Sequence, residues 1–367
     1  MSPEPRPTLT GSQGSLPRAR SGVISGYVLR LVREHLALTQ EQLAQHLSVS
    51  LDTIAGWETG RRALTAVSVG QMLMYRHTLL NLGATADLVT ALDRAMEADV
   101  LLTSALEERP TEASPLGAWV MQRDLAEMLT WPLHGRAPEA AAAPAVRPRR
   151  GPVPSGPTLG EQERTRFFAS LRTTAEQARQ PEQFLLRRQA LYLAGYDRSP
   201  DTGGWVAHQE HETRPGDWLQ HWLTARSVAS IGARQGDHDR VASFVRTAVA
   251  GDDRGEAANL NYWAYWVGET STIQLDDSFI ATGQAGDWTG RRLLQHLVDR
   301  LDPRFGYREL YIHTLWALIA ARPGLLQSTD RVVLRDRMEI LLDSGEISAQ
   351  AGRELEGVRY ALRLAPG

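Results

Sequence analysis

The chain has 367 residues, of which 42% are hydrophobic and 23% charged, so it has room for two or three globular domains. It contains no cysteine, which excludes disulfides, thiolate metal sites and cysteine nucleophiles, and no lysine, which excludes a Walker A loop and a lysine Schiff base. Because it has no run of 18 apolar residues and no signal sequence, we expect a cytoplasmic protein without membrane contact.

The charge is unevenly distributed along the chain. The formal net charge is −3, but residues 1–80 hold eight arginines against five acidic residues, a net charge of +3. A basic head on an acidic body predicts binding to nucleic acid with an affinity that falls as salt rises. Residues 1–20 predict a disordered arm, whose Arg18 and Arg20 either enter a minor groove or stay solvated. All 40 basic residues are arginine and alanine is frequent, which indicates a high-GC genome, as in actinobacteria.

Residues 27–62 are the most informative part of the chain. Their apolar periodicity predicts three short helices: Tyr27–His35, Gln40–Leu47 and Leu51–Glu58. Thr39, with Gln42 three residues later, forms a capping box for the second helix, and Ser50 caps the third. Because the turn between these two helices is very short, the helices must cross steeply, as in a helix-turn-helix unit.

A set of residues in this block has the pattern of a known family: Leu38-Thr39-Gln40, Leu43-Ala44, Leu47, Ser50, Ile54 and Trp57-Glu58-Thr59-Gly60-Arg61-Arg62. The block resembles the DNA-binding domain of the XRE, or phage-repressor-like, family. This resemblance implies that the third helix lies in the major groove and that Gln40 meets phosphate. It implies base-facing positions for Leu51, Asp52, Thr53, Ala55 and Gly56, beside the capping Ser50. Arg61 and Arg62 would contact the sugar-phosphate strand.

The resemblance also implies a buried ion pair between Arg33 and Glu58, which ties the first helix to the end of the third. Ser48 stands where the family usually has glycine, so we expect a positive φ or a shifted turn, at about 1 kcal/mol. Base-reading groups are few, because only Asp52 can accept from cytosine N4 and only Leu51 or Thr53 can touch a thymine methyl. Specificity is therefore expected to be modest or to depend on DNA shape. The alternative is a three-helix structural unit with no DNA role.

Two further helices follow this block. Apolar positions between Val67 and Leu80 predict a fourth helix ending near Gly83, and residues 86–107 predict a long amphipathic fifth. The apolar stripe of the fifth helix is either core or a dimer interface: Leu88, Leu92, Met96, Val100 and Leu106. With a short helical piece in 115–133, we expect a five-helix, lambda-repressor-like domain with extra helices over residues 21–135.

The composition changes at residues 136–158, which are rich in proline and arginine and predict an extended linker. Its Arg147, Arg149 and Arg150 either touch phosphate or only solubilise the segment. Residues 159–367 then alternate helical segments with glycine and proline turns and lack strand patterns. This predicts an all-helical sensor or dimerisation domain, either an orthogonal bundle or an array similar in architecture to tetratricopeptide repeats.

The second half offers one candidate ligand pocket, formed by residues of a single predicted helix: Asn259, Tyr262, Trp263, Trp266 and Glu269. The alternative is a buried helix whose indoles fill the core. His208, Glu210 and His211 lack the HExxH order and predict a charged loop, so we expect no metal site. No nucleophile elbow or phosphate loop is present, and we expect neither a cofactor nor enzymatic activity.

Together these patterns predict an all-α, sequence-specific transcriptional regulator that binds double-stranded DNA as a homodimer. Its C-terminal helices would pair the subunits or sense a small molecule, a peptide or a protein partner. The alternative from another class is an interaction scaffold or antitoxin-like protein in which the helix-turn-helix block mediates assembly.

Overall fold

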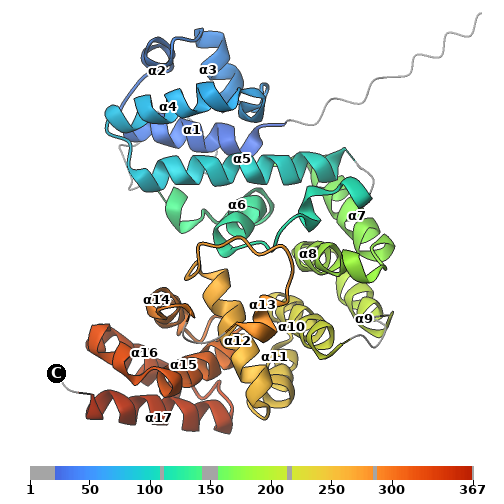
Figure 1. The fold of residues 1–367 in the computed structure, drawn as a ribbon, viewed down its shortest axis with the longest axis vertical. Helices are drawn as coiled ribbons and strands as arrows, with labels where there is room; N and C mark the ends of the chain where they lie inside the picture. Colours follow the sequence, from blue (N-terminus) through green and yellow to red (C-terminus); the bar gives the residue numbers. More distant parts are fainter. Residues whose placement is uncertain (1–20, 108–110, 143–155, 213–216, 284–286, 366–367) are drawn as a thin grey trace, which may run out of the picture.

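The computed structural model describes residues 21–107, 111–142, 156–212, 217–283 and 287–365. Arg18 and Arg20 of the arm, and Arg147, Arg149 and Arg150 of the predicted linker, lie outside these residues. Within them the chain forms seventeen α-helices and no strand, which confirms the all-α prediction. The molecule is elongated, with α1–α5 at one end and α14–α17 at the other (Figure 1). Among the described helices, none has the length and apolar character needed to cross a bilayer.

The N-terminal end contains the helix-turn-helix unit, α2 and α3, and four longer helices: α1 (Val23–His35), α2 (Gln40–Leu47), α3 (Leu51–Glu58), α4 (Val69–Asn81), α5 (Ala86–Leu106) and α6 (Arg123–His134). The bounds of α2 and α3 are those predicted from their N-caps, because Thr39 accepts from the Gln42 N–H and Ser50 from the Thr53 N–H. Ser48, at the end of α2, has φ 54° and ψ 43°, the left-handed conformation that the family's glycine would favour.

The start of α1 is capped by a side chain from a distant helix. Gly22, at its N-cap position, has no side chain to accept a hydrogen bond. Instead the buried Asp99 carboxylate of α5 accepts from the Ile24 N–H at 3.0 Å and the Ser25 N–H at 2.8 Å. Burial raises the pKa of Asp99 to about 6. The periodicity predicted that this helix begins at Tyr27. Because the cap acts on the N–H groups of Ile24 and Ser25, α1 begins at Val23 instead.

The N-terminal hydrophobic core extends beyond residues 136–158. It packs α1, α2, α3, α5 and α6, and it continues into α7 (Glu161–Gln177) and α8 (Phe184–Ala194) through Phe167, Phe168 and Leu186. At Gly156 the chain lies directly against α6. A Cβ added at this position would be only 2.7 Å from the indole nitrogen of Trp131. The two large cores therefore divide the chain after α8 and not at the proline-rich segment that composition indicated.

After α8, α9 (Thr202–Glu212) contributes Val206 to a small cluster with Leu191, Val228 and Ile231. The second large core is built by the helices that follow α9: α10 (Trp218–Gln235), α11 (His238–Phe244), a π-helical turn (Val245–Val249), α12 (Asp253–Trp266), α13 (Phe279–Thr282), α14 (Arg291–Arg300), α15 (Arg308–Ala321), α16 (Arg331–Ser344) and α17 (Ala349–Leu364). Many of these helices pack on a neighbour in the sequence, as α9 and α11 do on α10 and α16 does on α17. This arrangement leaves α12 near the middle of the molecule (Figure 1).

The histidine and carboxylate cluster predicted as a loop is helical. His208, Glu210 and His211 lie in α9, where the Glu210 carboxylate accepts from Arg240 at 3.3 Å. The loop prediction was wrong because Gly203 and Gly204, which indicated a turn, lie in the first turn of α9. Over the residues that the structure describes, no group of three or more histidines or carboxylates could hold a metal ion.

The apolar stripe of α5 faces mainly inward. Leu88, Leu92 and Leu106 are buried, Met96 packs against the core, and only Val100 is exposed. A different helix carries exposed apolar side chains at this end of the molecule. On α4 these are Val69, Leu73, Met74 and Leu80.

Candidate nucleic-acid interface and central cavity

Helix α3 is held in place by contacts on its inner face. Ile54 and Trp57 are buried in the N-terminal core. At Gly26 of α1 a Cβ would lie 2.0 Å from the Trp57 carbonyl oxygen, so only glycine allows the two backbones to approach this closely. The first turn of α3 faces outward, and the Leu51 side chain is 50% exposed.

A hydrogen-bonded ion pair links α1 to the end of α3. Arg33 donates from Nε to Glu58 Oε1 at 2.5 Å and from Nη2 to Glu58 Oε2 at 3.0 Å. Its Nη1 donates to the Leu38 carbonyl at 3.0 Å. The side chains of Arg33 and Glu58 are only 13% and 4% exposed, so this fork-shaped contact lies largely out of water.

The outer face of α3 carries one carboxylate and two arginines. Arg61 Nη2 lies 2.5 Å from Asp52 Oδ1, and Arg62 Nη2 lies 2.7 Å from Asp52 Oδ2. The hydrogen bond from Arg61 and its positive charge lower the pKa of Asp52. Arg62 Nη1 also donates to Thr53 Oγ1 at 3.1 Å. All three ion-paired side chains are exposed, so solvent screens these contacts and a competing phosphate can replace them.

Two residues that the resemblance assigned to DNA contact, Gly56 and Gln40, contact other parts of the protein instead. Gly56 is buried beneath the Arg62 side chain, whose Cδ would lie 3.0 Å from a Cβ at Gly56. The Gln40 amide donates to Glu58 Oε2 at 2.8 Å and so completes the α1–α3 ion pair. Gly56 therefore does not face outward. The exposed side chains of α3's first turn are Leu51 and Asp52, whereas Thr53 and Ala55 are half-buried and Ser50 is occupied in capping.

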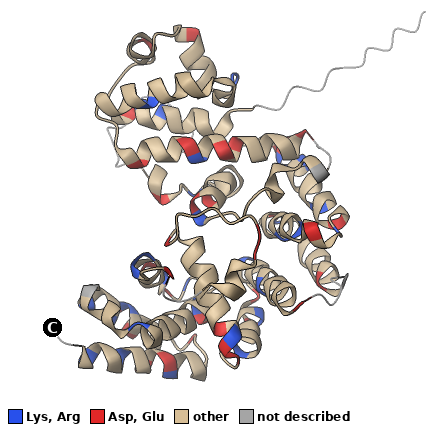
Figure 2. Ribbon diagram, viewed as in Figure 1, with Lys and Arg blue, Asp and Glu red and all other residues tan. Residues whose placement is uncertain are grey.

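Asp52 offsets part of the positive charge at this edge of α3. Several other acidic residues of the domain lie on α5, on the side of α1 opposite α3 (Figure 2). Arg61 and Arg62 follow α3 and give its edge a net positive charge.

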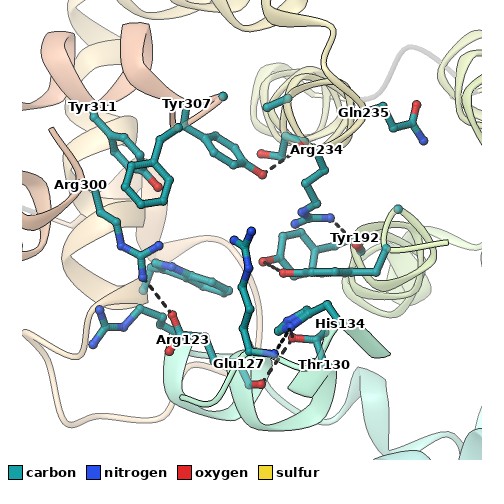
Figure 3. A pocket seen from close by; sticks show the side chains of 18 of the residues that line it. Arg123, Glu127, Thr130, His134, Tyr192, Arg234, Gln235, Arg300, Tyr307 and Tyr311 are labelled. Atoms are coloured by element: carbon teal, nitrogen blue, oxygen red, sulfur yellow. Dashed lines mark hydrogen bonds and ion pairs between the residues drawn. The ribbon is translucent and has the colours of Figure 1, made fainter. Parts of the chain in front are cut away.

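A central cavity of about 1000 Å³ lies between the two cores. Its walls come from α6, α8, α10, α12, α14 and residues 304–311 (Figure 3). Three residues of the predicted pocket, Tyr262, Trp263 and Trp266, line it. The arginines that face them come from helices in which no local pattern marks them, so they were not identified from the sequence.

The other two residues assigned to the pocket do not line the cavity. Asn259 is fully buried, donates to Thr314 Oγ1 at 2.8 Å and accepts from Arg226 at 3.1 Å. Glu269 accepts from the Leu293 N–H at 3.0 Å and so caps the start of α14. These two residues organise the helices around the cavity.

Comparison with known proteins gives one assignment. No curated protein and no solved structure matches the chain. Residues 26–106, from α1 to the end of α5, match the family model of a helix-turn-helix domain. The α2–α3 geometry and this match together identify the N-terminal part of the chain as a helix-turn-helix domain.

Proposed function

We propose that the chain is an XRE-type transcriptional regulator that places α3 in the major groove of double-stranded DNA. The observation that carries this proposal is the outward first turn of α3, with Leu51 and Asp52 exposed and Thr53 half-buried beside Arg61 and Arg62. On DNA the two arginines exchange the Asp52 carboxylate for phosphate oxygens, which frees Asp52 to accept from a cytosine N4 amine.

The inner contacts of α3 support this role because they make the reading surface rigid. Arg33, Glu58 and Gln40 hold the end of α3 against α1, and Ser50 fixes its first turn. A surface that is ordered before binding loses less conformational entropy when DNA docks. With few basic groups at the edge of α3, the affinity depends on few phosphate contacts, each contributing about −0.9 to the salt slope.

The active form in this proposal is a cytoplasmic homodimer. Two copies of α3 would lie about 34 Å apart, one turn of DNA, on a palindromic site. The exposed apolar residues of α4, Val69, Leu73 and Met74, support pairing through this helix, because contiguous exposed apolar surface marks protein contacts. The C-terminal helices, a tetratricopeptide-like array in this proposal, would sense an effector.

The test uses the full chain and duplexes containing random 20-base-pair cores, about two turns of DNA. We expect selection to enrich one motif. Asp52→Ala and Thr53→Ala should then change the base preference at single positions. Arg61→Ala and Arg62→Ala should weaken binding to all sequences and reduce the salt slope by about one each. The matched control is Arg363→Ala, an exposed arginine in α17 at the far end of the molecule.

Two outcomes would contradict this proposal. If the folded wild-type chain enriches no sequence, the regulator function is wrong. If Asp52→Ala and Thr53→Ala keep the wild-type preference, direct reading by α3 is wrong even where binding persists.

A second candidate is an interaction scaffold or antitoxin-like protein. The Asp52 carboxylate already pairs with both Arg61 and Arg62 and offsets one of their two charges, and α4 exposes apolar side chains, both of which favour a protein surface over DNA. Co-purification from the native host separates the two functions. A stoichiometric protein partner without retained DNA would favour the scaffold.

A further inference from the structure

The central cavity has more positive than negative charge in its lining. It is lined by seven arginines but only three carboxylates. Arg300 pairs with Glu127 at 3.5 Å and Arg123 with Glu139 at 3.5 Å, whereas the third carboxylate, Asp197, pairs with an arginine outside the lining. Two arginines of α10, Arg226 and Arg234, have no carboxylate within 4.0 Å among the described residues.

These two arginines are held by aromatic rings and neutral oxygens. The Arg226 guanidinium lies 3.9 Å from the Tyr262 ring centroid and 4.8 Å from that of Trp263. The Arg234 guanidinium lies 3.9 Å from the Tyr196 centroid, and its Nη1 donates to the Tyr192 carbonyl at 3.0 Å. Cation–π contacts orient a guanidinium but do not neutralise it, so both residues keep a net positive charge in a largely buried site.

Three residues of the cavity wall also carry buried hydrogen-bond donors without acceptors. Arg226 Nε, Trp263 Nε1 and His296 Nε2 have no hydrogen-bond partner, and their residues are 4%, 5% and 6% exposed. Arg123 Nη1 lies 3.0 Å from His296 Nδ1 and must donate to it, which places the ring proton of the neutral imidazole on Nε2. Burial, with the charges of Arg123 and Arg300, lowers the pKa of His296 to about 3, so this tautomer persists at neutral pH.

The complement of these donors is an acceptor-only group. Carboxylate, phosphate and sulfonate oxygens accept several hydrogen bonds and carry negative charge, whereas a neutral amide or alcohol would leave the arginines uncompensated. The remaining walls are aromatic. The Tyr262 and Trp266 rings stack with centroids 6.3 Å apart, and the Tyr192 ring meets the Trp266 ring edge at 5.7 Å.

We propose that this cavity binds a small effector that combines an aromatic ring with an acidic group, the acid meeting Arg226 and Arg234 and the ring packing on the aromatic wall. The volume of about 1000 Å³ is sufficient for such a ligand. Its role as an effector rests on the regulator function proposed above, whereas its binding does not.

Helix α6 connects this cavity to the helix-turn-helix domain. One face of α6 lines the cavity with Arg123, Glu127 and His134 (Figure 3). On the adjacent face of α6, four residues after Glu127, the Trp131 ring lies edge-on to Tyr27 of α1, with centroids 5.2 Å apart. A ligand that displaces Glu127 from Arg300 therefore acts on a helix that directly contacts α1.

The test compares two fluorescent probes that have the same rings and differ in charge. They are 1-anilinonaphthalene-8-sulfonate, which carries a sulfonate, and N-phenyl-1-naphthylamine, which is neutral. Both are titrated into the full chain without DNA, so a failure here is separate from a failure of DNA binding. The variants are Arg226→Gln and Arg234→Gln, the second being less buried and a safeguard if the first does not fold. The control is Arg254→Gln, an exposed arginine stacked on Trp218 outside the cavity.

We expect the sulfonate probe to bind wild type and Arg254→Gln equally and to bind each cavity variant about 10- to 100-fold more weakly, the usual range for losing a hydrogen bond to a charged group. The neutral probe should bind all folded variants equally. Equal sulfonate binding by wild type and Arg234→Gln would overturn the proposal, as would an equal loss for both probes.

Competition then distinguishes the source of the acid. Displacement of the sulfonate probe by adenosine 5′-monophosphate supports a phosphate ligand, and displacement by indole-3-acetate supports a carboxylate. Displacement by neither compound at millimolar concentration would contradict the assignment of the cavity to aromatic acids.

Discussion

Replacing Arg33 by alanine tests whether the ion pair holds α3 in its reading position. The substitution removes two hydrogen bonds to Glu58, at 2.5 and 3.0 Å, and one to the Leu38 carbonyl. Glu58, with a 4% exposed side chain, then keeps only the Gln40 amide as a side-chain donor among the described residues. A buried carboxylate that loses its cation is destabilised far more than an exposed one.

The free energy of unfolding should fall by about 3 to 5 kcal/mol, the range observed when one partner of a buried ion pair is removed. The N-terminal core spans about 170 residues, a size at which each kcal/mol lowers the melting temperature by about 2 to 4 °C. Arg33→Ala should therefore melt about 6 to 20 °C below wild type by circular dichroism.

The matched control is Arg30→Ala on the same helix. Arg30 donates to Glu34 at 2.8 Å in an i,i+4 pair near the surface, and such pairs contribute about 0.3 to 0.5 kcal/mol. A second variant, Arg33→Met combined with Glu58→Leu, should recover part of the loss because no buried charge remains. If Arg33→Ala and Arg30→Ala melt at the same temperature, the pair does not brace α3 and the reasoning fails.

Three further substitutions test local features of the same domain. Ser48→Gly should raise the free energy of unfolding by about 1 kcal/mol in urea titrations, because φ is 54° at this position, and an unchanged midpoint would argue against strain. Gly26→Ala should cost about 3 kcal/mol because its Cβ meets the Trp57 carbonyl at 2.0 Å, whereas Gly70→Ala, in a helix with open space, should be neutral or stabilising. The raised pKa of Asp99 means that the folded chain holds this proton more tightly than the unfolded chain, whose aspartates titrate near 3.9. Unfolding free energy should therefore fall by about 3 kcal/mol as pH rises from about 4 to about 6, and Asp99→Asn, measured across that range, should lack this component.

The features that sequence predicts well are those encoded within a few residues. The bounds of α2 and α3 follow from Thr39 and Ser50, because an N-cap acts on the N–H groups two or three positions ahead. The left-handed conformation of Ser48 is one of the two outcomes that the family resemblance implied, because the family usually has glycine at this position. The start of α1 does not, because its cap is Asp99, 74 residues from Ser25 in the chain.

The cavity shows why the candidate ligand site was only partly predictable. Tyr262, Trp263 and Trp266 form an unusual aromatic cluster within one helix, so the sequence reveals them. Arg226 and Arg234 belong to an ordinary amphipathic helix, and nothing local separates them from the surface arginines of the chain. Only the tertiary arrangement shows that they lack carboxylate partners while exposed arginines such as Arg304 have one.

Helix α1 is the element through which the cavity and the DNA-reading surface would communicate. Tyr27 of α1 contacts Trp131 of α6. Less than two helical turns later, Arg33 of α1 forms the ion pair with Glu58 of α3. Because Gly26 also brings the α1 backbone against Trp57, α1 and α3 should move together as one rigid unit. A ligand that shifts α6 would then alter the spacing between the two α3 helices of a dimer and leave each reading surface intact. The ligand can change DNA affinity only as much as its own binding free energy differs between the two spacings. A difference of about 1.4 kcal/mol in ligand binding therefore changes DNA affinity about tenfold.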